Sequence, residues 1–288
     1  MVFIKNDKIV AMQAQKKPRF SVVIPCYNEE AYIGETLDSL IGQDFKEPYE
    51  IIVVDNNCTD RTAEIAKSYK NVKVVKQKNP GVVWARQAGT ENASGEIVIS
   101  SDADTTFEST WLSQIDAQYK KSDKIIAVCG PCEFVNAPWW GSLYCYLLFN
   151  GVYHFQKILG RPNYITATNT SFKKSVWQGY NTNLTQGGDE FGLLLKLKKQ
   201  PGKIIFTRDY KVYTSSRRLE KGLAYNLFVS SLFYYFLAYY VDRIFQRPVI
   251  GHAPAYRPYT TALTIAKLLK TRSEKYTKLV DIRTFKKS

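Results

Sequence analysis

Carboxylates follow or end three of the predicted strands of this 288-residue chain. Tyr27 and Glu29 follow the first strand, Asp55 ends the second, and Asp102 and Asp104 follow the fourth. The Asp-x-Asp pair suits a hard divalent cation, Mg²⁺ or Mn²⁺, which takes one or two carboxylates plus substrate phosphates. Such a metal would neutralise charge that builds up on a departing pyrophosphate. One such strand end could be an ordinary turn, where Asp and Asn are common, but three together favour a ligand site.

Signatures of several other chemistries are absent from the sequence. With only His154 and His252, the chain cannot carry a His-Glu-x-x-His zinc motif. No glycine-rich dinucleotide or phosphate loop follows the first strand, which argues against a dinucleotide-binding enzyme and against a nucleotidyltransferase. Cys129-x-x-Cys132 is the only close pair among five cysteines and has no further ligands nearby, so we expect a structural or incidental role for it.

The elements that position these residues alternate regularly in the first half of the chain. β-Branched runs predict strands over 21–25, 51–55, 72–75 and 97–101. Helices are predicted between them, over 30–42, from Thr59 as N-cap to about 69, and over 82–93. Strands separated by helices of this length predict an α/β fold with a mostly parallel, Rossmann-like sheet and helices on both faces.

The second half is less regular and much more basic. Further strands are predicted over 125–128, 203–206 and 212–214, and two stretches, 139–156 and 222–241, hold no formal charge. Residues 1–150 carry 16 Lys/Arg and 19 Asp/Glu, a net charge of −3, whereas residues 151–288 carry 24 and 7, a net charge of +17. The second half is therefore expected to meet an anionic partner.

We expect three parts: an N-terminal arm (1–19), a catalytic domain (20–220) and a helical, basic C-terminal region (221–288). The N-terminus lacks the apolar region of a secretory signal, which favours a cytoplasmic protein. Residues 223–241 are long enough to span a bilayer but contain several polar side chains. A helix lying at the anionic inner face of the cell membrane is favoured; a buried aromatic helix with a solvated tail stays open. No nucleic acid is expected, because no recognised motif supports it, and the oligomeric state is left open.

Six motifs resemble, in order, those of glycosyltransferase family 2, the inverting nucleotide-sugar-dependent enzymes with the GT-A fold. They are VVIPCYNE at 22–29, IVVDNNCTD at 52–60, GVVWARQAG at 81–89, ASGEIVISSDAD at 93–104, NTSFKKS at 169–175 with GY at 179–180, and GDEFGLLLK at 188–196. The resemblance implies transfer of a sugar from a UDP- or GDP-type donor to a hydroxyl of a glycan or lipid-linked acceptor. A non-catalytic nucleotide-sugar or membrane-binding module on the same fold and a sugar nucleotidyltransferase remain the alternatives.

The resemblance also implies roles for individual donor-site residues. Residues expected to frame or contact the base and ribose are Pro25, Tyr27, Glu29, Asp55, Arg86 and Asp102. Asp104, with Asp102, is expected to bind Mg²⁺ or Mn²⁺. Arg217 and Arg218 resemble a position that can meet pyrophosphate, but a solvated basic turn is an equal alternative.

The acidic pair of the last motif departs from the usual order of the family. The family has Glu-Asp with the second residue as base, whereas this chain has Asp189-Glu190. Aligned on Leu193 and Lys196, Glu190 takes the position of the base, and Asp189 remains possible. Neighbouring residues at a helix start point about 100° apart, so we expect only one of them to face an acceptor hydroxyl.

Overall fold

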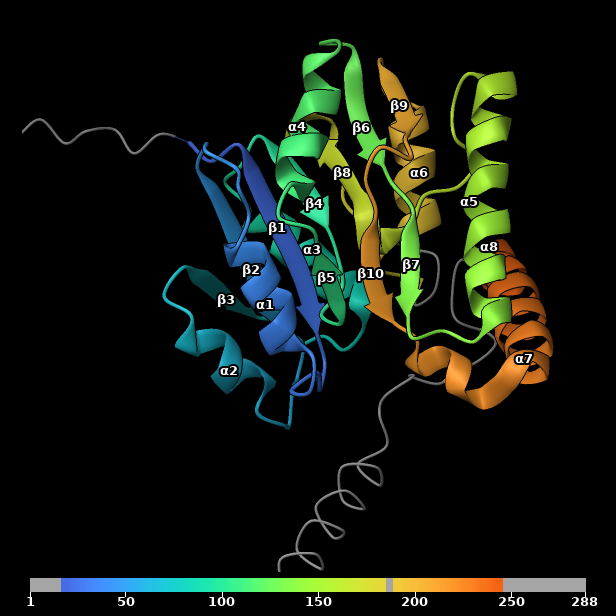
Figure 1. Ribbon diagram of the computed structural model, residues 1–288, viewed down its shortest axis with the longest axis horizontal. Coiled ribbons are helices and arrows are strands. Elements are labelled where there is room, and N and C mark those ends of the chain that lie inside the picture. The colour runs from blue at the N-terminus through green and yellow to red at the C-terminus, as the bar shows by residue number, and fades with distance from the viewer. Residues whose placement is uncertain (1–16, 185–188, 246–288) are drawn as a thin grey trace, which may run out of the picture.

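The computed structural model describes residues 17–184 and 189–245 and has two sheets (Figure 1). The larger sheet has seven strands in the order β3-β2-β1-β4-β8-β6-β9. Its strands are β1 (Phe20–Cys26), β2 (Tyr49–Asp55), β3 (Val72–Lys76), β4 (Ile97–Ser100), β6 (Ile125–Cys129), β8 (Thr170–Lys173) and β9 (Lys203–Phe206). All neighbouring pairs are parallel except those of β8, which runs antiparallel to both β4 and β6. The predicted α/β class with a mostly parallel sheet is confirmed.

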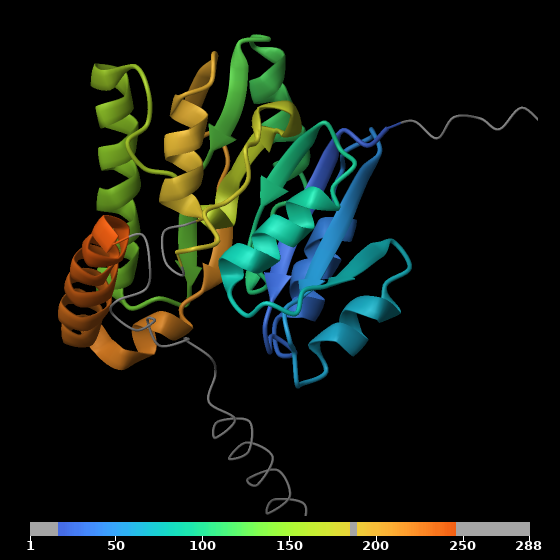
Figure 2. The same cartoon turned by 180° about the vertical axis from the view of Figure 1, so that it is seen from behind.

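Helices cover both faces of this sheet, as predicted. In opposite views, α1 and α4 lie on one face, and α3 and α6 on the other (Figures 1 and 2). The helix bounds are α1 (Ile33–Ile41), α2 (Thr62–Ser68), α3 (Val82–Glu91), α4 (Trp111–Lys120), α5 (Trp139–Leu159) and α6 (Glu190–Lys198). Because both faces are covered, the apolar residues of β1, β2 and β4 are almost completely buried and form the centre of the core.

A smaller, three-stranded sheet was not predicted as a unit. It has the order β5-β10-β7, from β5 (Thr105–Phe107), β7 (Cys132–Val135) and β10 (Val212–Ser215). β10 pairs antiparallel with β5, so Thr214 lies opposite Thr105. This pairing brings the chain just before residue 217 beside the Asp-x-Asp segment, although 110 residues separate Asp104 from Thr214.

Short helical segments complete the described chain. Single turns are η1 (Ala167–Asn169), η2 (Lys174–Val176) and η3 (Arg217–Lys221). The C-terminal helical segment consists of α7 (Gly222–Ala224), the π-helical η4 (Tyr225–Ala238) and α8 (Tyr239–Phe245). A helix after residue 221 was predicted; the predicted basic tail 267–288 lies outside the described residues.

The predicted N-cap at Thr59 is wrong. Helix α2 starts at Thr62, whose backbone N–H donates to Asp60 Oδ1 at 3.0 Å. Thr59 instead contacts the loop after β1, where its hydroxyl accepts from Asn28 Nδ2 at 3.1 Å. Thr59 therefore hydrogen-bonds to a residue 31 positions away in the sequence and does not cap α2. Residues 1–16 of the predicted arm 1–19 lie outside the described residues. Arg19, by contrast, is held to the fold by ion pairs with Asp116 and Glu96.

Candidate active site

The carboxyl ends of β1 and β2 form one edge of the site. Pro25 lies within β1 opposite Val54, and Asp55 ends β2. Asp55 Oδ1 accepts a hydrogen bond from the backbone N–H of Cys58 at 2.9 Å, which fixes the turn after the strand. Tyr27 follows β1 and is 39% exposed, so its ring is accessible to a ligand. The structure brings these residues together, and their contacts with a nucleobase stay a prediction.

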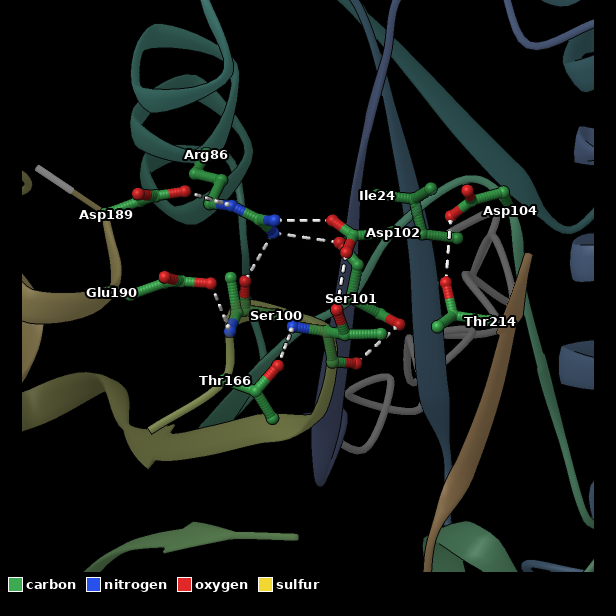
Figure 3. A network of polar contacts seen from close by, with 12 residues as sticks. Ile24, Arg86, Ser100, Ser101, Asp102, Asp104, Thr166, Asp189, Glu190 and Thr214 are labelled. Atoms are coloured by element: carbon green, nitrogen blue, oxygen red, sulfur yellow. Dashed lines mark hydrogen bonds and ion pairs between the residues drawn. The ribbon is translucent and has the colours of Figure 1, made fainter. Parts of the chain in front are cut away.

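Arg86 is the centre of a buried polar network beside that edge (Figure 3). Its Nη2 donates to Asp102 Oδ1 at 2.5 Å, and its Nε donates to Asp189 Oδ2 at 3.1 Å. Its Nη1 donates to the Ser100 hydroxyl at 2.6 Å and to the Ser101 carbonyl at 2.8 Å. The side chain predicted to meet the nucleotide therefore ties the end of β4 to the start of α6.

The packing of α3 explains why Arg86 reaches so far. A Cβ atom at Gly89 would lie 2.2 Å from Val23 Cγ1, so only glycine lets α3 approach β1 this closely. Residue 86 lies one helical turn earlier on the same side of α3. Its guanidinium thereby reaches the end of β4, and the residue as a whole is 2% exposed.

Asp102 is held from two sides. Oδ1 accepts from Arg86, and Oδ2 accepts from the Thr168 hydroxyl at 2.5 Å. Thr168 lies in η1, directly before the antiparallel strand β8, whose Thr170 is opposite Ser100 at the end of β4. Burial opposes ionisation of Asp102, but Arg86 and the Thr168 hydroxyl outweigh it and lower its pKa. Asp102 is therefore an ionised carboxylate in a fixed orientation.

A second network joins Glu29, Asp104 and Arg217. The Arg217 guanidinium forms a two-pronged contact with Glu29, from Nη1 at 2.6 Å and Nη2 at 2.8 Å. The same Nη2 lies 3.0 Å from Asp104 Oδ2, and the Thr214 hydroxyl donates to Asp104 Oδ1 at 3.3 Å. Burial raises the pKa of Asp104 and of Glu29 although Arg217 opposes it in both. The two carboxylates are thus incompletely neutralised by one arginine.

The carboxylate oxygens around Asp104 fit a divalent ion that the phosphates of a bound nucleotide would help to hold. Carboxylate oxygens are the ligands that Mg²⁺ and Mn²⁺ prefer, and Asp104 shares its arginine partner, Arg217, with a second carboxylate, Glu29. Within residues 17–184 and 189–245, no group of three His, Cys, Asp or Glu side chains could hold a metal by itself. Asp104, with Asp102 beside it in sequence, would therefore need phosphate oxygens and water to complete a coordination shell.

Asp189 and Glu190 stand next to each other at the start of α6, and their carboxylates contact different groups (Figure 3). Asp189 is bound by Arg86, whereas Glu190 Oε1 accepts from the backbone N–H of Ala167 at 3.2 Å. Burial, and then the charge of Asp189, raise the pKa of Glu190 to about 7, against the opposing effects of the Ala167 N–H and Arg86.

Several residues of the site were missed by the sequence analysis. They are neutral groups that hold the charged side chains: the Ser101 carbonyl and the hydroxyls of Ser100, Thr168 and Thr214. Only the SSDAD order hinted at the two serines, because they directly precede the Asp-x-Asp pair. Arg218, predicted beside Arg217, lies with its guanidinium carbon 5.9 Å from the Phe134 ring centre, and its charge acts on Asp104 and Asp102 by lowering the pKa of each.

The chain matches known sequences over its first two thirds. Residues 21–178 match the profile described as Glycosyl transferase family 2. Over 92 residues the chain is 39% identical to the poly(ribitol-phosphate) beta-N-acetylglucosaminyltransferase TarS of Staphylococcus aureus, covering 30% of this chain and 16% of TarS. Over 150 residues it is 30% identical to the glycosyltransferase GlyA of Streptococcus pneumoniae, covering 51% and 20%. The chain thus matches only a minor part of the length of these relatives.

Two solved structures share the fold. The S. aureus TarS fragment 1–349 superposes with a TM-score of 0.54 and 22% identity, covering 69% of this chain and 60% of that one. The mannosyltransferase PcManGT from Pyrobaculum calidifontis, in complex with GDP-Man and Mn²⁺, superposes with a TM-score of 0.59 and 21% identity, covering 83% and 67%. At these identities the likeness establishes the fold of the chain and no more.

Proposed function

We propose a function for this chain, which belongs to glycosyltransferase family 2 and has its GT-A type fold. It transfers a sugar, with inversion, from a nucleoside-diphosphate sugar to a hydroxyl of a glycan or lipid-linked acceptor. One observation carries the proposal: Arg86 joins the donor-side carboxylate Asp102 to the acidic pair at 189–190. A catalyst for this reaction needs a donor-phosphate site and a base in one fixed arrangement.

The base in this proposal is Glu190. The acceptor hydroxyl must lose its proton as its oxygen attacks the anomeric carbon, and a carboxylate within reach can accept it. A pKa near 7 suits a base at neutral pH, because it combines a useful ionised fraction with real proton affinity. Asp189, by contrast, is neutralised by the Arg86 guanidinium at 3.1 Å. We therefore assign proton transfer to Glu190 and the positioning of Arg86 to Asp189.

The other half of the reaction is departure of the nucleoside diphosphate. Its charge would be met by Arg217 and Arg218, which follow β10, and a divalent ion at Asp104 would add Lewis-acid stabilisation of the same phosphates. Arg217 already binds two carboxylates, so it can exchange one of them for a phosphate without leaving the site. A single displacement opposite the leaving group inverts the anomeric centre.

The donor is proposed at the level of its class. Solved relatives are in complex with UDP, with UDP-GlcNAc and with GDP-Man, so both uridine and guanosine donors deserve testing. Tyr27, 39% exposed at the end of β1, is the side chain proposed to stack on the base. We propose the cytoplasmic side of a membrane as the place of the reaction, because residues 151–288, with a net charge of +17, suit its anionic inner face.

The test is a mass-spectrometric screen of UDP- and GDP-sugars with the purified chain. Release of free nucleoside diphosphate that depends on Glu190, with Glu190→Gln as the matched variant, supports the proposal. Binding of a nucleotide sugar without any turnover would instead favour a non-catalytic module, and release of pyrophosphate from a nucleoside triphosphate would favour a nucleotidyltransferase.

A further inference from the structure

Helix α5 has an outward face unlike that of an ordinary surface helix. One stripe packs on β7 and β9, and Phe149 stacks on Phe206 with 5.9 Å between ring centres. The opposite side is apolar and exposed, from Trp139 at 75% to Ile158 at 78%. Outward helix faces are normally charged, yet residues 139–156 carry no formal charge.

The C-terminal helical segment continues this exposed surface. It lies beside α5 at one end of the molecule in both views (Figures 1 and 2). We use the name apolar surface for the large apolar side chains of residues 139–159 and 222–245 that are at least 41% exposed, with Trp139, Leu147, Ile158, Leu227, Phe228 and Ile244 as its main members. So many large apolar side chains at one end of a molecule indicate an interaction site.

Two cations lie beside α5. Lys157 Nζ and the Arg208 guanidinium carbon lie 4.6 Å and 4.0 Å from the ring centre of Tyr153 on that helix. The chain as a whole is basic, because residues 151–288 have a net charge of +17. An apolar, aromatic surface with cations beside it, on a strongly basic chain, complements a surface that is apolar inside and anionic outside.

The apolar surface is also connected directly to the candidate active site. Leu219 of η3 is buried against the start of α5, where a Cβ on Gly141 would lie 2.4 Å from Leu219 Cδ1. Two residues earlier in the same turn, Arg217 binds Glu29 and Asp104. One short turn thus joins the donor-phosphate site to the elements that carry the apolar surface.

We propose that the apolar surface docks on an anionic phospholipid bilayer and presents the active site to a lipid-linked acceptor. The second clause rests on the proposed function, whereas the docking does not. None of the helices in the described ranges is both long and apolar enough to cross a membrane. In the proposed arrangement α5 and the C-terminal helical segment lie on the bilayer with their apolar side chains among the headgroups. A second copy of the chain is the less suitable occupant, because a symmetric interface would bring together two chains of net charge +14, each with Lys157 and Arg208 beside α5.

The experiment measures flotation of the full chain with vesicles, in the absence of any donor. Vesicles of phosphatidylcholine alone are compared with vesicles that contain phosphatidylglycerol, at low and at high salt. The test variant carries Leu147→Glu and Ile158→Glu, at positions 60% and 78% exposed, and the control variant carries Ile41→Glu on α1, at 40% exposure. Circular dichroism melting and titration with UDP and GDP establish that each variant is folded.

Binding to phosphatidylglycerol vesicles that falls about tenfold or more in the double variant, but not in Ile41→Glu, is the expected result. Equal binding of the double variant would overturn the proposal, since segment 246–288 alone would then suffice. Absence of binding by the wild type, or a dimer in sedimentation that the double variant converts to monomer, would overturn it as well. Donor turnover measured without vesicles separates these outcomes from a failure of the proposed function.

Discussion

The base assignment predicts an unusual pH dependence of sugar transfer. A carboxylate with the ordinary glutamate pKa of about 4.3 is almost fully ionised at pH 6, so activity would change little between pH 6 and pH 8. Glu190 has a pKa of about 7 because it is buried beside Asp189. Its ionised, proton-accepting fraction is then about one tenth at pH 6 and about nine tenths at pH 8. Activity should therefore rise roughly tenfold over this range as the pH is raised through 7.

The assay is kcat/KM for the acceptor from pH 5.5 to 8.5, with nucleoside diphosphate release as the readout. Glu190→Gln preserves size and can still accept from the Ala167 N–H, but cannot take the proton. It should lower turnover by roughly a hundredfold or more with little change in donor affinity. Donor titration by calorimetry separates the two effects.

Asp189→Asn is the matched control. It removes the negative charge next to Glu190 and leaves Arg86 with less compensation, and both changes lower the pKa of Glu190. The rise in activity should therefore move to lower pH while turnover at pH 8 stays substantial. A profile that is flat from pH 5.5 to 8, or an inactive Asp189→Asn beside a nearly normal Glu190→Gln, would refute the assignment.

Three further predictions concern the metal, the arginine and stability. Asp104→Ala, or excess chelator with the wild type, should abolish transfer because a ligand to the pyrophosphate-binding ion is lost; full activity in chelator would exclude the metal-assisted mechanism. Arg86→Met should reduce the free energy of unfolding in urea by about 3 to 5 kcal/mol, since Asp102 and Asp189 lose their buried counter-charge; a change under about 1 kcal/mol would mean that the network is dispensable. Because burial raises the pKa of Glu190 from an ordinary value of about 4.3 to about 7, stability falls as the pH rises between these two values and is lowest above them, so Glu190→Gln should raise the Tm more at pH 8 than at pH 5; equal effects at both pH values would contradict the raised pKa.

The sequence by itself determined the alternating elements of the first half and the family. Runs such as IIVVD predict buried strands rather than other secondary structure, because β-branched residues prefer strands and apolar side chains on both faces of a strand must be buried. Strand β1 was predicted over 21–25 and is formed by Phe20–Cys26, and β4 was predicted over 97–101 and is formed by Ile97–Ser100. The motifs also identified carboxylates that the fold does gather along one edge, while their individual roles stay predictions.

Only the tertiary structure decided how those charges are paired. Propensity and periodicity report on neighbours a few residues apart. Arg86, however, binds Asp102, which is 16 residues away in the sequence, and Asp189, which is 103 residues away. Arg217 reaches Glu29 across 188 residues, which required the pairing of β10 with β5. The antiparallel insertion of β8 placed Thr168 on Asp102 and the Ala167 N–H on Glu190. Burial beside these partners sets the pKa of each carboxylate, and burial is a property of the packed chain rather than of any local run of residues.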